Sequence, residues 1–251
     1  MLVLWLVSLR RQDASVVDAW WGPGLALLGW TAVATAGPSP RGLLLAALAS
    51  AWGLRLGVHL LRRWRAHGED RRYAAMRAAH GPRFRWVSLG TVFLLQWALQ
   101  WVVALPLQAG AALGGGAPLG PLDALGAVVF GAGLAFEALA DAQLKRFLAD
   151  PASRGRVMDR GLWAWSRHPN YFGDFTAWWG LGLVALGAGA WWALLGPAAL
   201  SLLLLRVSGV KLLERSIGDR RPGYSDYAAR TNAFFPRPPR PARRAGQAGP
   251  G

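Results

Sequence analysis

The sequence predicts an all-α protein, a polytopic bundle of transmembrane helices with six full spans and a partial span at the N-terminus. Three observations lead to this prediction. Runs of Leu, Ala, Val and Gly recur along the 251 residues, and most approach the roughly 20 residues that a helix needs to cross a bilayer. Lys and Arg are confined almost entirely to alternate linkers between these runs. The 15 Trp residues agree with a membrane location, because Trp favours the membrane interface.

Six segments have the composition of a span. They are residues 16–36, 41–61, 86–107, 122–140, 172–186 and 190–207. The fifth is short and is expected to begin near Pro169, because proline is favoured in the first turn of a helix. Residues 1–9 are too short to span. We expect them to be the end of a seventh span whose start lies upstream, the alternative being a short hydrophobic stub.

The basic residues predict the orientation. The linkers 10–13, 62–85 and 141–168 and the tail from residue 211 hold 25 of the 28 Lys and Arg residues. The alternate linkers hold none, although Arg41 lies beside the first of them. Under the positive-inside rule the basic set is cytoplasmic, so we expect a cytoplasmic C-terminus.

Composition limits the chemistry. Without cysteine there is no disulfide, thiolate nucleophile or Cys-ligated metal, and the four His residues lack metal-ligand spacing, so we expect no metal site. A net charge of +15 would suggest nucleic-acid binding in a soluble protein. Beside these apolar runs it favours membrane lipid as a partner, and we expect no nucleic acid.

The chain is expected to form one transmembrane domain over residues 1–235. Residues 236–251 are basic and rich in Pro and Gly, and they cannot build a core. We expect this tail to be disordered.

Two carboxylates lie at the cytoplasmic end of the fourth segment. Glu137 and Asp141 are four residues apart and therefore share one helix face. Ionisable groups at membrane depth are functional candidates, and this pair is suited to accept hydrogen bonds from a ligand's hydroxyl or amide groups. The alternative is a charged helix end wetted by lipid headgroups.

The start of the fifth segment is dense in functional groups. Asn170 and Asp174 share a face, and Gly173 permits close approach of a ring or helix. Arg167 and His168 precede them, where a helix start favours a phosphate. Alternatively Arg167 and His168 mark the headgroup boundary, with Tyr171 in the aromatic belt.

Two further groups are candidates. Glu214 is followed by Tyr224, Tyr227 and Arg230 on a partly helical cytoplasmic segment that binds either a ligand's phosphate or lipid headgroups. In the second segment His59 is a candidate proton donor, one turn from Arg55. Arg55 either snorkels to the interface or pairs with Asp18. No glycine-rich dinucleotide fingerprint occurs, so a nucleotide would be held by side chains and helix ends.

The segment Gly161–Asp174 resembles the signature of the bacterial DUF1295 family, which is related to the steroid 5-alpha-reductase C-terminal domain. The resemblance covers nearly the whole chain. It includes residues 13–22, 68–77, 93–96, 140–147 and 220–236. It implies a protein of the bacterial cytoplasmic (inner) membrane, with an NADPH pocket among its C-terminal helices that opens to the cytoplasm.

By resemblance, Asn170 holds the nicotinamide end of NADPH, and Asp174 replaces the Glu of the reductases with a side chain one methylene shorter. Asp141 matches an Asp of the preceding helix, and Arg156 matches an Arg that approaches the adenosine or phosphate part. Residues from Tyr224 to Arg230 fall in the segment that closes over the cofactor. The predicted cofactor-binding residues are Glu137, Asp141, Arg156, Arg167, His168, Asn170, Tyr171, Asp174, Glu214, Tyr224, Tyr227 and Arg230.

We therefore expect an NADPH-dependent oxidoreductase that reduces the C=C bond of a lipophilic enone. The steroid enzymes use a Tyr and a Glu at the substrate carbonyl, but the first three full segments contain no Tyr, and Tyr73 is expected in a loop. His59 is therefore the predicted catalytic acid. Two alternatives remain open. One is an S-adenosylmethionine-dependent methyltransferase of a lipid or lipidated thiol, and the other is a non-catalytic lipid-binding membrane protein.

Overall fold

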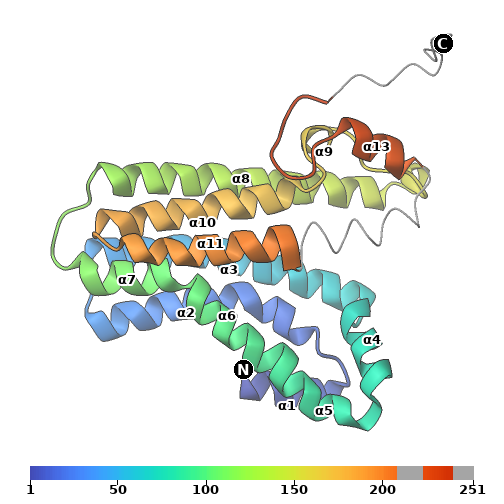
Figure 1. The fold of residues 1–251 in the computed structure, drawn as a ribbon, viewed down its shortest axis with the longest axis horizontal. Coiled ribbons are helices and arrows are strands. Elements are labelled where there is room, and N and C mark those ends of the chain that lie inside the picture. Colours follow the sequence, from blue (N-terminus) through green and yellow to red (C-terminus); the bar gives the residue numbers. More distant parts are fainter. Residues whose placement is uncertain (208–222, 240–251) are drawn as a thin grey trace, which may run out of the picture. The chain divides into compact units, whose positions relative to one another are not determined.

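The computed structural model describes residues 1–207 and 223–239, and 81% of these described residues are helical, with no strand among them (Figure 1). The all-α prediction is confirmed. Glu214 and most of the predicted disordered tail, residues 240–251, lie outside the described residues.

The chain divides into two compact units. The first comprises residues 1–128 and 179–199, and the second comprises residues 129–178 and 200–251. The boundary runs through three helices, α8 (Pro121–Ala149), α10 (Pro169–Gly187) and α11 (Leu195–Leu202).

The first unit contains most of the helices. They are α1 (Leu2–Arg11), α2 (Val16–Ala36), α3 (Pro40–His67), α4 (Arg71–His80), α5 (Phe84–Ser88), α6 (Leu95–Val103) and α7 (Leu105–Gly114), with a π-helical turn at Leu89–Leu94 and a 3-10 turn at Trp191–Leu194. Helix α2 packs along α3 through glycines: a Cβ added to Gly22 would lie 2.4 Å from the carbonyl oxygen of Gly53. Small residues at such crossings let membrane helices approach closely.

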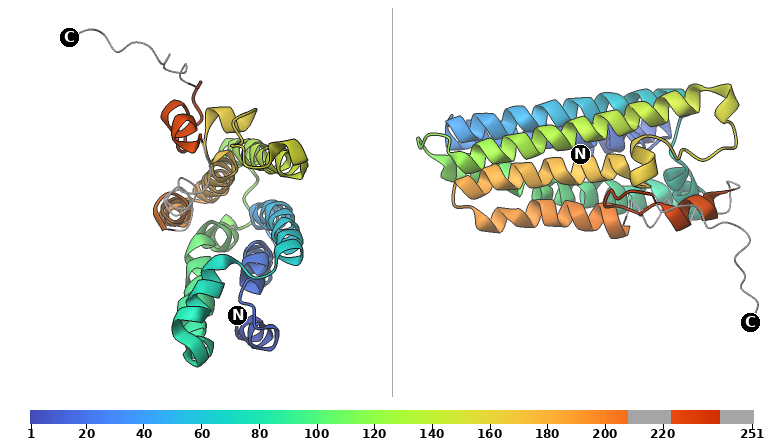
Figure 2. Two further views of the ribbon diagram at one scale, coloured as in Figure 1. Left: turned by 90° about the vertical axis from the view of Figure 1, so that its right-hand side faces the viewer. Right: turned by 90° about the horizontal axis from the view of Figure 1, so that it is seen from above.

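In the second unit, α8 and α10 lie side by side (Figure 1, Figure 2). The short helix α9 (Leu162–Trp165) precedes α10, and α13 (Tyr224–Arg230) follows the residues that are not described. A π-helical turn at Leu203–Val207 extends α11. Helix α10 begins at Pro169, as the sequence predicts.

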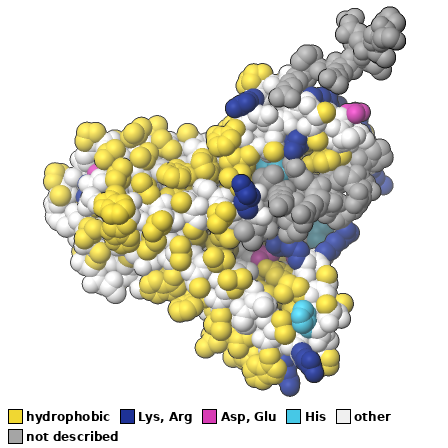
Figure 3. Space-filling model, viewed as in Figure 1, with side chains coloured by type: hydrophobic (Ala, Val, Ile, Leu, Met, Phe, Trp, Pro, Cys, Tyr) yellow, Lys and Arg dark blue, Asp and Glu magenta, His cyan; other side chains and the backbone are white. Residues whose placement is uncertain are grey.

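Helices occur at all six segments predicted as spans, and α2 has the predicted bounds. Three helical stretches of the described chain are long and apolar enough to cross a membrane: Pro40–His67, Arg71–Val103 and Pro121–Ala149. A shorter apolar stretch covers Trp191–Arg206. Large apolar side chains such as Trp191 and Val128 are about 70% exposed, at 72% and 69%. Hydrophobic side chains cover much of the face drawn in Figure 3, which is typical of a membrane protein.

Two local predictions are wrong. Tyr73 lies in α4, not in a loop, and it is buried against Phe84 and Phe93. Asp18 pairs with Arg72 instead of Arg55, because α4 folds back beside the start of α2.

Candidate functional site

Helices α8 and α10 touch at two glycines. A Cβ added to Gly173 would lie 2.5 Å from the backbone nitrogen of Glu137, and one added to Gly133 would lie 2.4 Å from that of Ala177. The absence of side chains at these positions brings the two backbones into contact. The faces that carry the predicted polar residues therefore meet.

Asp141 and Asn170 lie across this contact. The Asn170 side-chain amide donates a hydrogen bond to Asp141 Oδ1 at 3.2 Å. Glu137 and Asp174, each four residues away on the same helices, are 4% and 9% exposed. Glu137 and Asp141 of α8 and Asn170 and Asp174 of α10 therefore come from two helices whose backbones touch.

The charge of this polar cluster (Glu137, Asp141, Asn170 and Asp174) limits what it can bind. Three of its members are carboxylates, which accept hydrogen bonds when ionised, and Asn170 both donates and accepts. The cluster therefore suits a ligand portion that carries hydroxyl, amide or cationic donors.

The residues before α10 are packed rather than solvated. His168 is 4% exposed, its ring stacks on Tyr171 with centroids 5.6 Å apart, and its backbone N–H donates to Ser166 Oγ at 3.1 Å. Ser166 Oγ in turn donates to the carbonyl oxygen of Phe234 at 2.7 Å. Burial of His168 argues against its assignment to the headgroup boundary.

Arg167 holds the end of α13. Its Nη1 donates to the carbonyl oxygens of Ala228 and Thr231 at 2.8 and 2.9 Å, and its backbone N–H donates to that of Asn232 at 2.8 Å. A guanidinium at a helix C-terminus satisfies carbonyls that the helix leaves open and complements its dipole. The sequence did not predict this role, and contact of Arg167 with a ligand phosphate stays a prediction.

Residues 223–237, which we call the C-terminal strap, dock on residues 159–170. The Tyr227 hydroxyl donates a hydrogen bond to the carbonyl oxygen of Trp163 at 2.6 Å. The backbone N–H of Arg237 donates to the carbonyl oxygen of Trp165 at 3.0 Å, and Arg230 forms an ion pair with Asp159. Burial raises the pKa of the Tyr227 hydroxyl, so this donor keeps its proton through the physiological range. Tyr224 packs edge-on against Tyr227.

The strap is connected to α8 through Trp163. The indole N–H of Trp163 donates to the carbonyl oxygen of Ala140 at 3.0 Å, one residue before Asp141. Gln143 Oε1 accepts from the N–H of Leu162 at 2.9 Å. The strap, α9 and α8 therefore meet next to the polar cluster.

An aromatic cluster, which was not predicted from the sequence, packs α10 against α8 and the C-terminal strap. Phe172 lies 5.5 Å from Phe136 and 5.9 Å from Phe234, and Phe175 lies 5.5 Å from Phe234, all edge-on between ring centroids. The apolar pair Phe234-Phe235 just before the basic tail is the sequence signal that could have indicated this docking.

The remaining predicted residues lie apart from these contacts. Arg156 is exposed in the loop after α8, and its N–H donates to the carbonyl oxygen of Ser153. His59 belongs to the first unit, half-buried on α3. Its catalytic role stays a prediction.

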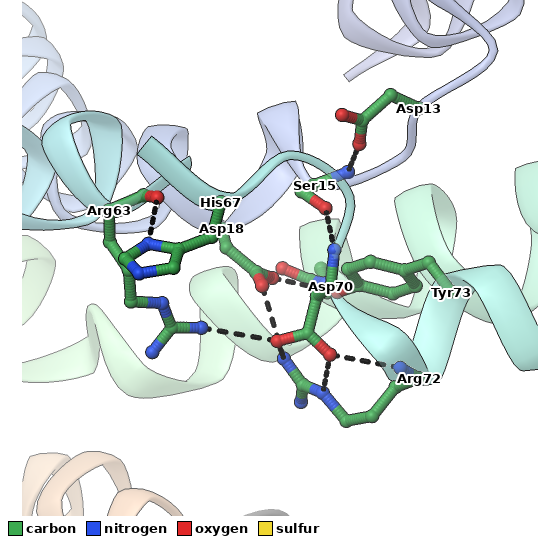
Figure 4. A network of polar contacts seen from close by, with 9 residues as sticks. Asp13, Ser15, Asp18, Arg63, His67, Asp70, Arg72 and Tyr73 are labelled. Atoms are coloured by element: carbon green, nitrogen blue, oxygen red, sulfur yellow. Dashed lines mark hydrogen bonds and ion pairs between the residues drawn. The ribbon is translucent and has the colours of Figure 1, made fainter. Parts of the chain in front are cut away.

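The first unit holds a polar network that the sequence analysis did not predict (Figure 4). Asp18 accepts hydrogen bonds from the Tyr73 hydroxyl at 2.7 Å and from Arg72 at 3.1 Å. Gln96 donates to the Tyr73 hydroxyl at 3.2 Å. Asp70 caps α4 and pairs with Arg72 and Arg63.

The first unit also holds a buried ion pair. Arg41 donates to both carboxylate oxygens of Asp123, at 2.7 and 2.8 Å, and the two residues are 4% and 1% exposed. Both begin long helices next to linkers without basic residues. Arg41 is the one arginine beside these linkers, and this isolation is the sequence signal that could have indicated a buried acidic partner.

The model of the family described as "Protein of unknown function (DUF1295)" matches residues 4–231. No curated protein and no solved structure matches the chain. The family match extends from α1 into the C-terminal strap, so it includes the polar cluster and the start of the strap.

Proposed function

Because the chain belongs to the DUF1295 family, whose description assigns no reaction, we propose its activity from its own residues: it is an NADPH-dependent membrane reductase of the C=C bond in a lipophilic enone. The observation that carries the proposal is the contact of Asn170 with Asp141 between α10 and α8, with Glu137 and Asp174 buried on the same helices.

The polar cluster fits the nicotinamide end of the cofactor. A carboxamide presents two N–H donors and one acceptor, and the ribose presents hydroxyl donors. The carboxylates of Asp141 and Asp174 accept such donors, while the Asn170 amide offers both kinds of group. Glu137 and Asp174 are buried, which limits the competition of water for bonds to their carboxylates.

The phosphates of the cofactor need cations, and none of the four residues of the polar cluster is cationic. The loop after α8 supplies them, because Arg154, Arg156 and Arg160 are all exposed there. Guanidinium groups bind phosphate oxygens in pairs of parallel hydrogen bonds. We assign Arg156 to this role, and Tyr224, Tyr227 and Arg230 of the strap to closing the cofactor's cytoplasmic side.

When bound, NADPH supplies a hydride to the β-carbon of the enone. The protein then has to stabilise the negative charge that develops on the carbonyl oxygen and deliver one proton to the α-carbon. The product is the saturated ketone. His59 is the proposed acid, and Tyr73, whose hydroxyl is buried and hydrogen bonded, is the other side chain to test.

We propose six full spans with a cytoplasmic C-terminus in the inner membrane. Each predicted segment is helical, and the basic linkers alternate with linkers that hold no Lys or Arg. This topology puts the polar cluster, the loop with Arg156 and the strap on the cytoplasmic side, where NADPH is available.

One observation favours the methyltransferase alternative. Three carboxylates in one cluster suit a cationic ligand as well as a neutral donor, and S-adenosylmethionine carries a sulfonium and an ammonium group. A lipid-binding protein without catalysis is the third outcome to distinguish.

Ligand-dependent stabilisation of the detergent-purified chain tests the proposal. NADPH, NADH and S-adenosylmethionine are compared by thermal shift for the wild type and for Asn170→Ala, with Gln108→Ala, an amide outside the cluster, as control. A ligand at one hundred times its Kd stabilises by about 2.7 kcal/mol, which a melting curve resolves. We expect NADPH to stabilise the wild type and Gln108→Ala but not Asn170→Ala.

The other outcomes are equally informative. Stabilisation by S-adenosylmethionine alone would replace reduction with methyl transfer. A flat response to all three ligands would leave lipid binding as the better proposal. If NADPH binds, its consumption with candidate lipophilic enones and loss of turnover in His59→Gln or Tyr73→Phe identify the acid.

A further inference from the structure

A pocket of about 400 Å³ in the first unit lies at the junction of α1 and α3, lined by Arg11, Asp13, Trp64 and Arg65. None of these residues belongs to the proposed cofactor site. Its volume lies in the range of small-molecule sites in proteins.

The walls of this pocket are fixed by hydrogen bonds. Asp13 accepts from the Trp64 indole N–H at 2.6 Å and from the Ser15 N–H at 2.8 Å. The linker that carries Asp13 is also tied to the linker between α3 and α4, because the Ala14 N–H donates to Glu69 at 2.9 Å and Ser15 Oγ accepts from the Asp70 N–H at 2.8 Å. Figure 4 shows Asp13, Ser15 and Asp70 in this arrangement. Asp13 and Trp64, which form one wall of the pocket, are therefore held in place before a ligand arrives.

The pocket is positively charged on balance. Arg11 and Arg65 are exposed, and among the described residues neither forms an ion pair. The Arg11 guanidinium stacks on the Trp64 ring at 5.4 Å, which orients its remaining donors. The carboxylate of Asp13 is already hydrogen bonded on both oxygens, which reduces its repulsion of an incoming anion.

We expect the pocket to lie at the depth of lipid headgroups. Helix α3 has 28 residues, and at about 1.5 Å per residue it exceeds the roughly 30 Å hydrocarbon core. Its last turns, with Trp64 and Arg65, therefore extend past the hydrocarbon. Trp at this level is typical of the membrane interface.

We propose that this pocket binds a phosphate group, with Arg11 and Arg65 donating to its oxygens and Trp64 forming one wall. The phosphate comes from an anionic phospholipid headgroup or from the free anion. Two guanidiniums on one phosphate form charge-assisted hydrogen bonds, which are stronger than those of neutral groups.

Native mass spectrometry of the detergent-purified full chain tests this proposal with phosphatidylglycerol as the probe. The pocket variant is Arg11→Gln/Arg65→Gln. The control variant is Arg71→Gln/Arg83→Gln, which removes the same charge at two exposed arginines outside the pocket. We expect one saturable lipid adduct in the wild type. In the pocket variant the affinity for the lipid should fall at least about tenfold, which corresponds to the loss of roughly one charge-assisted hydrogen bond. In the control variant the affinity should stay unchanged.

Equal loss of lipid in both variants, or no adduct in the wild type, would overturn the proposal, because diffuse charge attraction would then suffice. Arg11→Lys/Arg65→Lys keeps the charge but not the paired donors, and we expect intermediate affinity from it. Competition with inorganic phosphate separates the sources. Displacement of the lipid at millimolar phosphate indicates a site for the free anion, whereas retention of the lipid indicates a headgroup site.

Discussion

The ion pair of Arg41 with Asp123 is buried where the chain is expected to meet the membrane. Its two parallel hydrogen bonds, and a third to Asp123 from the Gly120 N–H at 2.7 Å, compensate the cost of removing both charges from water. The pair therefore fixes the starts of α3 and α8 against each other. Its contribution depends on both partners being present.

Removal of one partner should be costly. We expect Asp123→Ala to lower the free energy of unfolding by about 3–5 kcal/mol, because a buried guanidinium loses its counter-charge. The double variant Arg41→Met/Asp123→Leu should recover much of this loss. Thermal melts measure both, and Arg63→Gln, which breaks an exposed pair with Asp70, should change stability by less than about 1 kcal/mol. Equal effects of Asp123→Ala and Arg63→Gln would contradict this account.

Asp70 is the residue for which a pH effect is expected. Burial by itself raises the pKa of the Asp70 carboxyl. Two effects outweigh burial and lower this pKa: hydrogen bonds from the side chain and backbone N–H of Arg72, and the positive charges of Arg72 and Arg63. A lowered folded-state pKa means that the stabilisation is complete above the unfolded value of about 3.9 and is lost as the pH falls through the folded value.

We therefore expect Tm of the wild type to fall more steeply than that of Asp70→Asn as the pH is lowered from 6 towards about 3, the range around the carboxyl pKa. The variant starts from a lower Tm because it lacks the charged cap of α4. Parallel pH profiles for the two proteins would show that the Asp70 charge contributes nothing.

At the scale of elements, Gly173 decides how closely α8 and α10 approach. A methyl group there would meet the backbone and Cβ of Glu137 at 2.5 to 2.7 Å, and backbone atoms cannot move aside easily. We expect Gly173→Ala to destabilise the protein by about 1–3 kcal/mol, as overpacking does, and to weaken NADPH binding by separating Asn170 from Asp141. Gly131→Ala on α8, where a Cβ meets nothing within 4 Å, is the matched control.

The control should be neutral or slightly stabilising, because alanine favours a helix by up to about 1 kcal/mol over glycine. Thermal melts and the NADPH thermal shift measure both effects. A Gly173→Ala protein that keeps its stability and its ligand response would show that the close approach of α8 and α10 is not needed.

The helices could be predicted from the sequence, whereas their partners could not. Hydropathy and length gave the bounds of α2, and proline chemistry gave the start of α10 at Pro169. The spacing of Asn170 and Asp174 predicted a shared face. The pairing of Tyr73 with Asp18, or of Arg167 with the end of α13, depends on how distant segments fold back, which a local pattern does not encode.

At the scale of the whole molecule, the linkers alternate in charge along the chain. The linkers that hold most of the Lys and Arg include the loop with Ala152, and the linker with Ala117 holds none. Moving arginine across a bilayer is costly, so this asymmetry is kept once the helices are inserted. The proposed cofactor site depends on it, because NADPH must reach the polar cluster from the cytoplasm.

The lack of native cysteine makes this orientation directly measurable. Ala117 and Ala152 are both exposed, and the predicted topology puts them on opposite sides of the membrane. We expect Ala117→Cys to react with a membrane-impermeant maleimide in intact cells. We expect Ala152→Cys to react only after the membrane is opened. The cysteine-free parent chain controls for background labelling. Labelling of Ala152→Cys in intact cells would invert the topology and place the polar cluster away from cytoplasmic NADPH. If Ala152→Cys is cytoplasmic and NADPH stabilises the protein only when Asn170 is present, both results support the proposed function. The polar cluster would then lie on the side of the membrane where NADPH is available.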